Sequence, residues 1–144
     1  MFNPGDAIRS YKVDKVLNMG AFANSYIVSD AAGNSYFMKE YSDPKESDPI
    51  FADFYRNQEV IISRLGAMSS ITEKFFEHFV LDGVYYQVKE SLHGMDLWEW
   101  LNAHVNYEDR IPLSVIICGA IRTIHENRIV HQDLKPQQVM MVDD

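Results

Sequence analysis

Two strand-like runs that are separated only by Asp82 and Gly83 constrain the fold of this chain most. The runs cover residues 75–81 (FFEHFVL) and 84–88 (VYYQV), and both are rich in aromatic and β-branched residues. An Asp-Gly pair between such runs is a strong signal for a two-residue hairpin turn, because both turn positions require positive φ. The sequence therefore predicts two adjacent antiparallel strands here.

A second pair of strand-like runs comes earlier in the chain. Residues 25–29 (SYIVS) and 35–40 (SYFMKE) flank a loop of turn-forming residues, DAAGN. After a proline-marked loop at 42–49, residues 53–65 contain good helix formers and end just before Gly66. The first ninety residues thus predict strands with one helix among them.

From Leu97 onward the pattern becomes helical. Within 113–124 the apolar residues recur at the spacing of an amphipathic helix: Leu113, Ile116, Ile117, Ala120, Ile121 and Ile124. A strand-rich half with one helix, followed by a helical half, indicates an α+β arrangement of two lobes. We expect the join near residues 89–94.

Composition narrows the class of protein. Of 144 residues, 47% are hydrophobic and 12% aromatic, as in a folded globular protein. The net charge of −8 argues against a nucleic-acid partner. The most apolar run, 111–121, is too short to span a bilayer, and the N-terminus does not resemble a secretory signal. With Cys118 as the single cysteine, we expect a soluble cytoplasmic protein with no membrane partner.

The polar turn at 131–138 (HQDLKPQQ) carries the clearest chemical signal. A loop carboxylate such as Asp133 can accept the proton of a hydroxyl nucleophile or orient that hydroxyl. Lys135 can neutralise charge on a transferred phosphoryl group, and Pro136 stiffens the turn between them. The pattern H-x-D-L-K-P specifies five residues within six positions, so we reject the alternative of an ordinary solvated turn.

This turn resembles the catalytic loop of protein kinases of the serine/threonine type, and the resemblance extends over about residues 8–142. Four segments agree with that family in order and spacing. They are LNMGAFANSYIV (17–28), like the glycine-rich loop over ATP phosphates; YFMKEY (36–41), like the strand with the phosphate-binding lysine; YYQVKESLHGMDLWEWL (85–101), like the hinge region; and IRTIHENRIVHQDLKPQQV (121–139), like the helix before the catalytic loop.

The resemblance implies a protein-kinase-like α+β fold, with a five-stranded antiparallel N-lobe and one helix over 1–91 and a partial helical C-lobe over 92–144. It implies ATP and Mg²⁺ as cofactors and a protein as substrate. Asp133 and Lys135 are the implied catalytic residues, and Gln138 is the implied, weakened ligand of Mg²⁺. The implied nucleotide-binding residues are Leu17, Gly20, Ala21, Phe22, Ala23, Lys39, Glu59, Glu90 and Leu92.

Two of these residues are expected to act as a pair. Lys39 lies in a strand of bulky residues, where an unpaired ammonium would be costly. Glu59 follows twenty residues later, and the resemblance implies that its carboxylate pairs with Lys39 and keeps it charged. His131 is expected to support the catalytic loop by packing and hydrogen bonding.

Several positions depart from the family pattern. Asn18 and Ala23 replace two glycines of the loop, Phe37 replaces the small residue beside adenine, Lys89 stands at the gatekeeper position, and Gln132 replaces an arginine. No D-F-G segment precedes the last residues, Asp143 and Asp144, which resemble a turn at a strand end. We therefore expect a kinase domain truncated before that segment, completed by a missing C-lobe segment or by a second chain.

Three functions remain open. The leading hypothesis is an ATP-dependent protein serine/threonine kinase, because the implied catalytic residues are all present. The second is a pseudokinase-like protein-binding scaffold without turnover, which the departures favour. The third is a small-molecule phosphotransferase of related fold, although those enzymes generally lack the D-L-K-P run.

Overall fold

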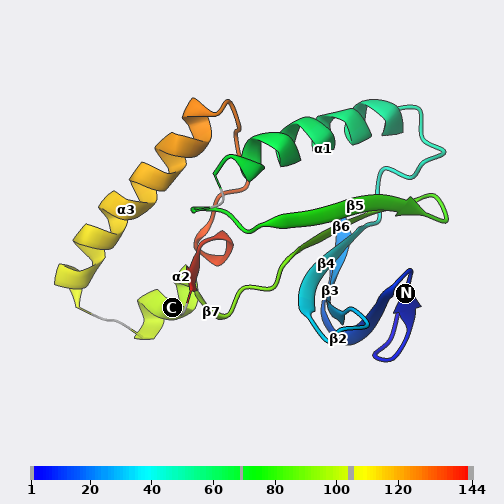
Figure 1. The fold of residues 1–144 in the computed structure, drawn as a ribbon. Helices are drawn as coiled ribbons and strands as arrows, with labels where there is room; N and C mark the ends of the chain where they lie inside the picture. The colour runs from blue at the N-terminus through cyan, green and yellow to red at the C-terminus, as the bar shows by residue number, and fades with distance from the viewer. Residues whose placement is uncertain (1, 69, 104–105, 143–144) are drawn as a thin grey trace. The chain divides into compact units, whose positions relative to one another are not determined.

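The computed structural model describes residues 2–68, 70–103 and 106–142 (Figure 1). The chain forms two compact units. Unit 1 comprises Met1–Gly66 and Glu73–Ser91, and unit 2 comprises Ala67–Thr72 and Leu92–Asp144. Asp143 and Asp144, which the sequence places at a strand end, lie outside the described residues.

Unit 1 contains a six-stranded antiparallel sheet with the order β1-β2-β3-β4-β6-β5. Its strands are β1 (Ala7–Ile8), β2 (Tyr11–Met19), β3 (Ala23–Ser29), β4 (Ser35–Tyr41), β5 (Phe75–Leu81) and β6 (Val84–Glu90). The kinase-like α+β class is confirmed, but the expected strand count of five was wrong. The additional strand, β1, has only two residues, which is too short to produce a recognisable alternation of polar and apolar side chains.

The turns between the strands form as their sequences predict. Asp82 and Gly83 have φ values of 51° and 74°, which confirms the hairpin between β5 and β6. In the loop between β3 and β4, the Asp30 carboxylate accepts hydrogen bonds from the main-chain N–H groups of Ala32 and Asn34, each at 2.9 Å.

The hydrophobic core lies on one face of the sheet. The core residues alternate along the strands, and they are Ile8, Val13, Tyr26, Val28, Met38, Phe79, Tyr86 and Val88. Strands β2 and β5 also meet through side chains, since the Tyr11 hydroxyl donates to the Glu77 carboxylate at 2.7 Å. The guanidinium of Arg9 lies 4.4 Å from the ring centre of Phe79. The sheet therefore curls around its own core.

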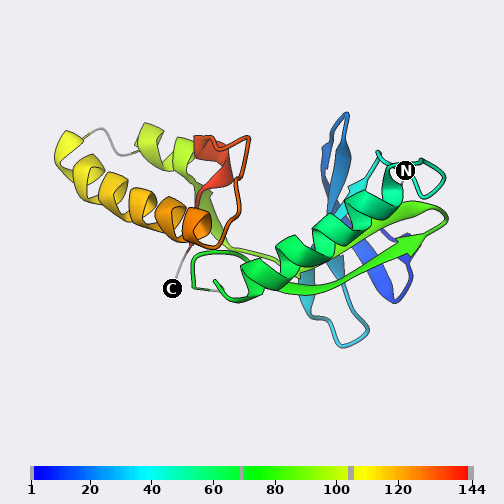
Figure 2. The same ribbon diagram turned by 90° about the horizontal axis from the view of Figure 1, so that it is seen from above.

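The other face of the sheet carries the helix α1 (Phe51–Gly66), which contains the predicted helix 53–65. Figures 1 and 2 show α1 running alongside β5 and β6. The ring of Phe54 lies 5.7 Å from that of Tyr41 and 5.2 Å from that of Tyr85, centre to centre. The Gln87 amide on β6 donates a hydrogen bond of 2.9 Å to the Gln58 carbonyl on α1. Aromatic rings and one polar contact thus attach the helix to the sheet.

The described residues of unit 2 form two α-helices, a short 3₁₀ helix and a two-stranded ribbon, and the sequence did not predict this ribbon. These elements are β7 (Gly94–Asp96), α2 (Leu97–Ala103), α3 (Tyr107–Glu126), η1 (Pro136–Gln138) and β8 (Met140–Val142). Strand β7 pairs with β8 in antiparallel register, with Met95 opposite Met141. The Leu97 N–H donates to the Val139 carbonyl oxygen at 2.8 Å, which ties α2 to the chain just before β8.

Helix α3 contains the predicted helix 113–124 and begins at the N-cap Asn106, whose side chain accepts a hydrogen bond from the Glu108 N–H. Ile111, Val115 and Ile116 on this helix are each about two-thirds exposed. Ile116 belongs to the predicted apolar stripe, so that part of the stripe is not buried here. Within the described ranges, no helix is both long and apolar enough to cross a membrane.

Gly94 offers a direct test of the β7–β8 pairing. Its φ is 143°, and a Cβ atom added there would clash with the main-chain oxygen of Met141. We therefore expect Gly94→Ala to destabilise unit 2 by about 2–4 kcal/mol, as a lower midpoint in thermal unfolding followed by circular dichroism.

Gly119→Ala is the matched control for this substitution. Gly119 lies inside α3 with open space around its Cβ position, so alanine should raise helix stability by about 0.5–1 kcal/mol. Equal effects of the two substitutions would contradict the close approach of Gly94 to β8.

Candidate active site

Lys39 lies near the centre of unit 1, on the sheet face that carries α1. It sits on β4 opposite Gln87 of β6, and strand alternation places it on the same face as Phe37 and Tyr41. Its Nζ atom lies 4.8 Å from the ring centre of Tyr41. The Tyr41 ring therefore shields this ammonium from water on one side.

A second lysine and one carboxylate share this environment. The Nζ atom of Lys89 lies 2.9 Å from Oε1 of Glu73 and 4.5 Å from the ring centre of Phe75. Burial, and next the positive charge of Lys89, lower the pKa of Lys39, whereas the Glu73 carboxylate opposes this shift. Glu73 thus acts electrostatically on two lysines at once.

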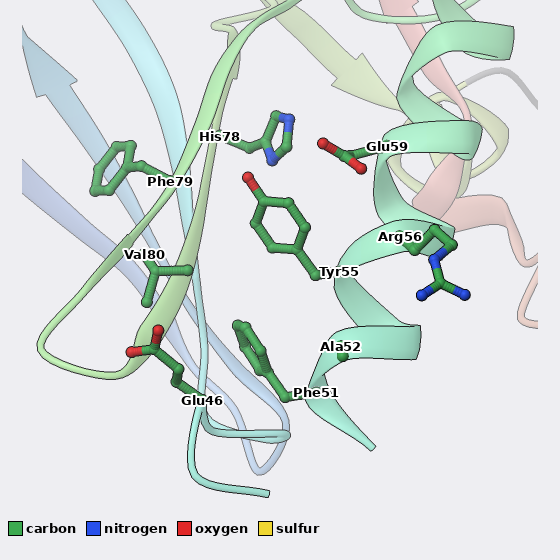
Figure 3. Close-up of a pocket in the computed structure, with 9 residues that line it drawn as sticks. All are labelled: Glu46, Phe51, Ala52, Tyr55, Arg56, Glu59, His78, Phe79 and Val80. Carbon is green, nitrogen blue, oxygen red and sulfur yellow. The ribbon is translucent and has the colours of Figure 1, made fainter. Parts of the chain in front are cut away.

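The expected ion pair between Lys39 and Glu59 is not formed. Among the ion pairs of the described residues, none joins these two side chains, and Glu59 is exposed on α1. Gln58, the preceding residue, faces the sheet, and successive helical residues are rotated by about 100° about the helix axis. Glu59 therefore points elsewhere, toward the side of Tyr55 and His78 (Figure 3).

A neutral hydrogen-bond network occupies the position next to Lys39. Gln87 is only 2% exposed. Its amide nitrogen donates to the Gln58 carbonyl oxygen at 2.9 Å and to the Tyr85 hydroxyl at 3.3 Å. Its amide oxygen accepts from the Tyr41 hydroxyl at 3.1 Å. Sequence reasoning missed this network, although a glutamine within VYYQV is a visible polar interruption of an apolar strand.

The loop between β2 and β3 contains the expected phosphate-contacting residues. The Gly20 N–H donates to the Ala23 carbonyl oxygen at 3.0 Å, and a Cβ atom at Gly20 would lie 2.9 Å from that same oxygen. Position 20 therefore favours glycine. Phe22 at the loop tip is 79% exposed, and Leu17 and Ala21 are also exposed.

The expected catalytic turn lies in unit 2, between α3 and β8. The Lys135 Nζ atom lies 3.1 Å from Oδ2 of Asp133, and both side chains are at least half exposed. Gln132, just before Asp133, has a φ of 66°, and the Gln138 N–H donates to the Lys135 carbonyl oxygen at 2.8 Å. The expected packing role of His131 was wrong for this structure, since its side chain is exposed.

Glu90 and Leu92, two of the implied nucleotide-binding residues, lie at the end of unit 1 and at the start of unit 2 respectively. Glu90 ends β6, and its N–H donates to the Lys74 carbonyl oxygen at 2.8 Å. The Glu90 carboxylate also lies 3.6 Å from the Lys74 Nζ atom. Leu92 follows in the segment before β7 and is partly buried. The candidate nucleotide-binding residues other than Leu92 therefore belong to unit 1, and the catalytic pair belongs to unit 2.

The residues present suit the phosphates of the implied cofactor better than its metal ion. Gly20 and the ammonium of Lys39 are suited to phosphate oxygens, because one allows close main-chain approach and the other is a cation. In the described part of the chain, no three His, Cys, Asp or Glu side chains gather as a metal site. The amide oxygen of Gln138 can supply one ligand, so phosphates and water would have to supply most of an octahedral Mg²⁺ shell.

The known proteins to which this chain is similar include serine/threonine-protein kinases. No protein-family model matches the chain. It is 27% identical over 134 residues to a probable serine/threonine-protein kinase 2 of Plasmodium falciparum, covering 91% of this chain and 25% of that protein. It is 26% identical over 134 residues to the serine/threonine-protein kinase PrkC of Bacillus subtilis, covering 91% of this chain and 20% of that protein.

Solved structures agree at the level of the fold. A crystal structure of the PknI kinase domain of Mycobacterium tuberculosis matches 99% of this chain and 59% of that domain, with a TM-score of 0.76 and 16% identity. These findings confirm the resemblance to serine/threonine protein kinases that the motifs indicate. The chain has the fold of the corresponding part of a protein kinase domain, and it spans a quarter or less of the length of the two curated relatives above.

The tyrosines beside Lys39 predict a pH dependence of stability. Burial raises the pKa of Tyr85 to about 12, whereas an unfolded tyrosine titrates near about 10. Because the folded state favours the neutral phenol, this contribution to stability is complete below about pH 10 and is lost as the pH rises through about 12. We expect the free energy of unfolding in urea to fall over this interval.

Tyr85→Phe should make that fall shallower, because the substitution removes one of the shifted phenols. At neutral pH the variant should remain folded, since Gln87 keeps its hydrogen bond with Gln58. An identical pH dependence in the wild type and in Tyr85→Phe would contradict the assigned shift.

Proposed function

We propose that this chain carries nucleotide-binding residues and the catalytic loop of an ATP-dependent protein serine/threonine kinase. The observation that carries the proposal is the pairing of Asp133 with Lys135 at 3.1 Å, in the H-x-D-L-K-P turn of a chain that resembles such kinases over nine-tenths of its length. The fold similarity to a kinase domain supports it. The proposed reaction is phosphoryl transfer from MgATP to a protein hydroxyl.

In this proposal, the two exposed residues of the turn have distinct tasks. The Asp133 carboxylate accepts a hydrogen bond from the substrate hydroxyl and orients it for attack. The Lys135 ammonium, which is already held beside that carboxylate, stabilises negative charge on the transferred phosphoryl group. Both side chains are sufficiently exposed for a protein substrate to reach them.

The residues of unit 1 bind the phosphate chain in the same proposal. The ammonium of Lys39 interacts with phosphate oxygens, whose negative charge favours the protonated amine and opposes the lowering of its pKa by burial and by Lys89. Gly20 allows the main chain to approach the phosphates closely. When bound, MgATP supplies the phosphoryl group and the divalent charge, and Gln138 offers one amide oxygen to the metal.

A pseudokinase-like protein-binding scaffold without turnover is the second candidate. The absence of an ion pair between Lys39 and Glu59 among the described residues supports it, as does the second cation, Lys89, beside Lys39. Phe37 also lies on the same sheet face, where the family has a small residue. These features weaken the case for ordinary nucleotide binding without removing the catalytic turn.

The remaining parts of the proposal concern partners and location. We propose a protein substrate and a cytoplasmic location, without a nucleic-acid or membrane partner. The exposed apolar side chains of Ile111, Val115 and Ile116 support coverage of α3 by a further C-lobe segment or by a second chain.

Asp133→Asn tests the catalytic assignment in the longest natural form of the protein. We expect phosphoryl transfer to a protein substrate to fall by about 10²–10⁴-fold, because the amide cannot accept the hydroxyl proton. The affinity for MgATP, measured by titration calorimetry, should change by less than about twofold, since the change is confined to the turn.

Asp14→Asn is the matched control, because Asp14 is an exposed carboxylate on β2 outside the candidate site, and this variant should retain wild-type transfer. Near-native turnover by Asp133→Asn would refute the assigned role of Asp133. Absence of both MgATP binding and phosphoryl transfer in the wild type would favour the scaffold.

A further inference from the structure

Lys89 is a second cation on the sheet face that carries Lys39. The two residues lie on the neighbouring strands β6 and β4 (Figure 1). In the register of these strands, Lys39 is opposite Gln87, and Lys89 lies two residues further along β6. Such diagonal neighbours are about 7–8 Å apart, within reach of long side chains. Burial, and next the positive charge of Lys89, lower the pKa of Lys39, so the two ammonium groups share one electrostatic environment.

The charges around Lys39 do not balance. Among the described residues, the charged groups that act on Lys39 are the ammonium of Lys89 and the carboxylate of Glu73. Two ammonium groups therefore share one carboxylate, which leaves an excess of positive charge on this part of the face. The whole chain, in contrast, has a net charge of −8. A local excess of positive charge on an otherwise acidic protein attracts anions to that place.

The ammonium of Lys89 is held beside apolar rings. Phe37 lies opposite Lys89 on β4, and Phe75 lies opposite it on β5. The Lys89 Nζ atom is 4.5 Å from the ring centre of Phe75, and the lysine side chain is only 15% exposed. An ammonium with so little access to water requires an anionic partner, because an unpaired charge is costly to bury.

Glu73 supplies this anion, and its position allows it to be replaced. Its Oε1 atom lies 2.9 Å from the Lys89 Nζ atom. Glu73 precedes β5 and does not belong to a strand, and its side chain is 35% exposed. The carboxylate can therefore turn toward water, whereas β6 fixes the main chain of Lys89. A phosphate oxygen in place of the carboxylate would keep the ammonium paired through a charge-assisted hydrogen bond.

A neutral group placed on Lys89 would bring a cost that a phosphate avoids. A nucleobase is uncharged at neutral pH, so it would remove water from the ion pair of Lys89 with Glu73 without supplying a compensating charge. A linear chain of phosphates has negative oxygens along its whole length, so it can contact Lys39 and Lys89 at the same time. The geometry therefore favours phosphates over a base beside Lys89.

We propose that Lys89 is a second phosphate-binding residue, and that Lys39 and Lys89 together bind a linear triphosphate chain. This inference rests on the proposed function, in which Lys39 binds phosphate oxygens. The chain of phosphates is either a free inorganic triphosphate or the triphosphate end of a nucleotide. The affinity depends on the phosphates and not on the base, and Glu73 competes with the phosphates for Lys89.

Titration calorimetry of the whole chain with inorganic triphosphate, ATP and adenosine tests this proposal. Mg²⁺ is left out, so that only the cations of the chain itself bind the phosphates. We expect triphosphate and ATP to bind within about threefold of each other, and adenosine to bind at least about tenfold more weakly, because adenosine has no charge for the two lysines. Both stronger affinities should fall as the salt concentration rises.

Two variants with matched controls connect the binding to Lys89. Lys89→Met should weaken triphosphate binding by about tenfold, whereas Lys12→Met, the same charge change at an exposed residue of β2, should bind within about twofold of the wild type. Glu73→Gln should strengthen binding by about fivefold, because it removes the competing carboxylate. Asp14→Asn is its control on β2 and should also bind within about twofold of the wild type. Circular dichroism checks that each variant is folded.

The outcomes separate this inference from the proposed function. If Lys39→Met abolishes ATP binding and Lys89→Met leaves it unchanged, the inference is wrong and the phosphate-binding role of Lys39 stands. If neither substitution changes ATP binding, both are wrong. Adenosine binding as tight as that of ATP, no binding of triphosphate, or equal weakening by Lys89→Met and Lys12→Met would also overturn the inference. If Lys89→Met fails to fold, an unchanged affinity in Glu73→Gln overturns it instead.

Discussion

The pairing of β4 with β6 is the interaction on which the rest of unit 1 depends. The register that places Lys39 opposite Gln87 also places Phe37 opposite Lys89 and Tyr41 opposite Tyr85. Because side chains alternate along a strand, one face therefore receives both lysines and the buried glutamine. A shift by a single residue would send these polar groups into the apolar core. Burial of the apolar face therefore fixes the register of β4 and β6, and this register positions Lys39 and Lys89 on the opposite face.

The apolar face contains a polar group of its own. Glu40 follows Lys39 on β4, so its side chain points to the opposite face of the sheet, which is the core side. This side chain is almost fully buried. Its carboxylate accepts hydrogen bonds from the Tyr26 hydroxyl, the Asn24 amide and the Tyr86 hydroxyl. These donors satisfy a carboxylate that would otherwise be costly to bury. They also connect β3, β4 and β6, so the polar cluster stabilises the same register that positions Lys39.

Local patterns predicted the parts of this structure that local sequence determines. The Asp82-Gly83 turn, the loop at 30–34, α1 and α3 all depend on residues close together in the chain, and each is present. The ribbon of β7 and β8 joins residues more than forty positions apart, so no local signal marks it. Glu59 was wrongly expected to pair with Lys39, because spacing along the sequence does not specify which side of a helix meets the sheet.

Glu73 was missed for a related reason. It precedes β5 and reaches the Lys89 ammonium only because the β5–β6 hairpin folds back, which the hairpin signal predicts in outline but not in side-chain detail. The turn at 131–138 was easier to interpret, since Asp133 and Lys135 are two residues apart and meet within one loop. Short-range chemistry was therefore predictable from this sequence, and the electrostatic partner of Lys39 was not.

The pKa of the Lys39 ammonium, measured by NMR in three forms of the chain, tests most directly whether Glu73 rather than Glu59 sets its charge. The wild type should have a pKa below the ordinary value for lysine, because burial and Lys89 both lower it. Glu73→Gln should lower the pKa further by removing the opposing negative charge, whereas Glu59→Gln should leave it unchanged. A pKa that responds to Glu59→Gln and not to Glu73→Gln would contradict this account.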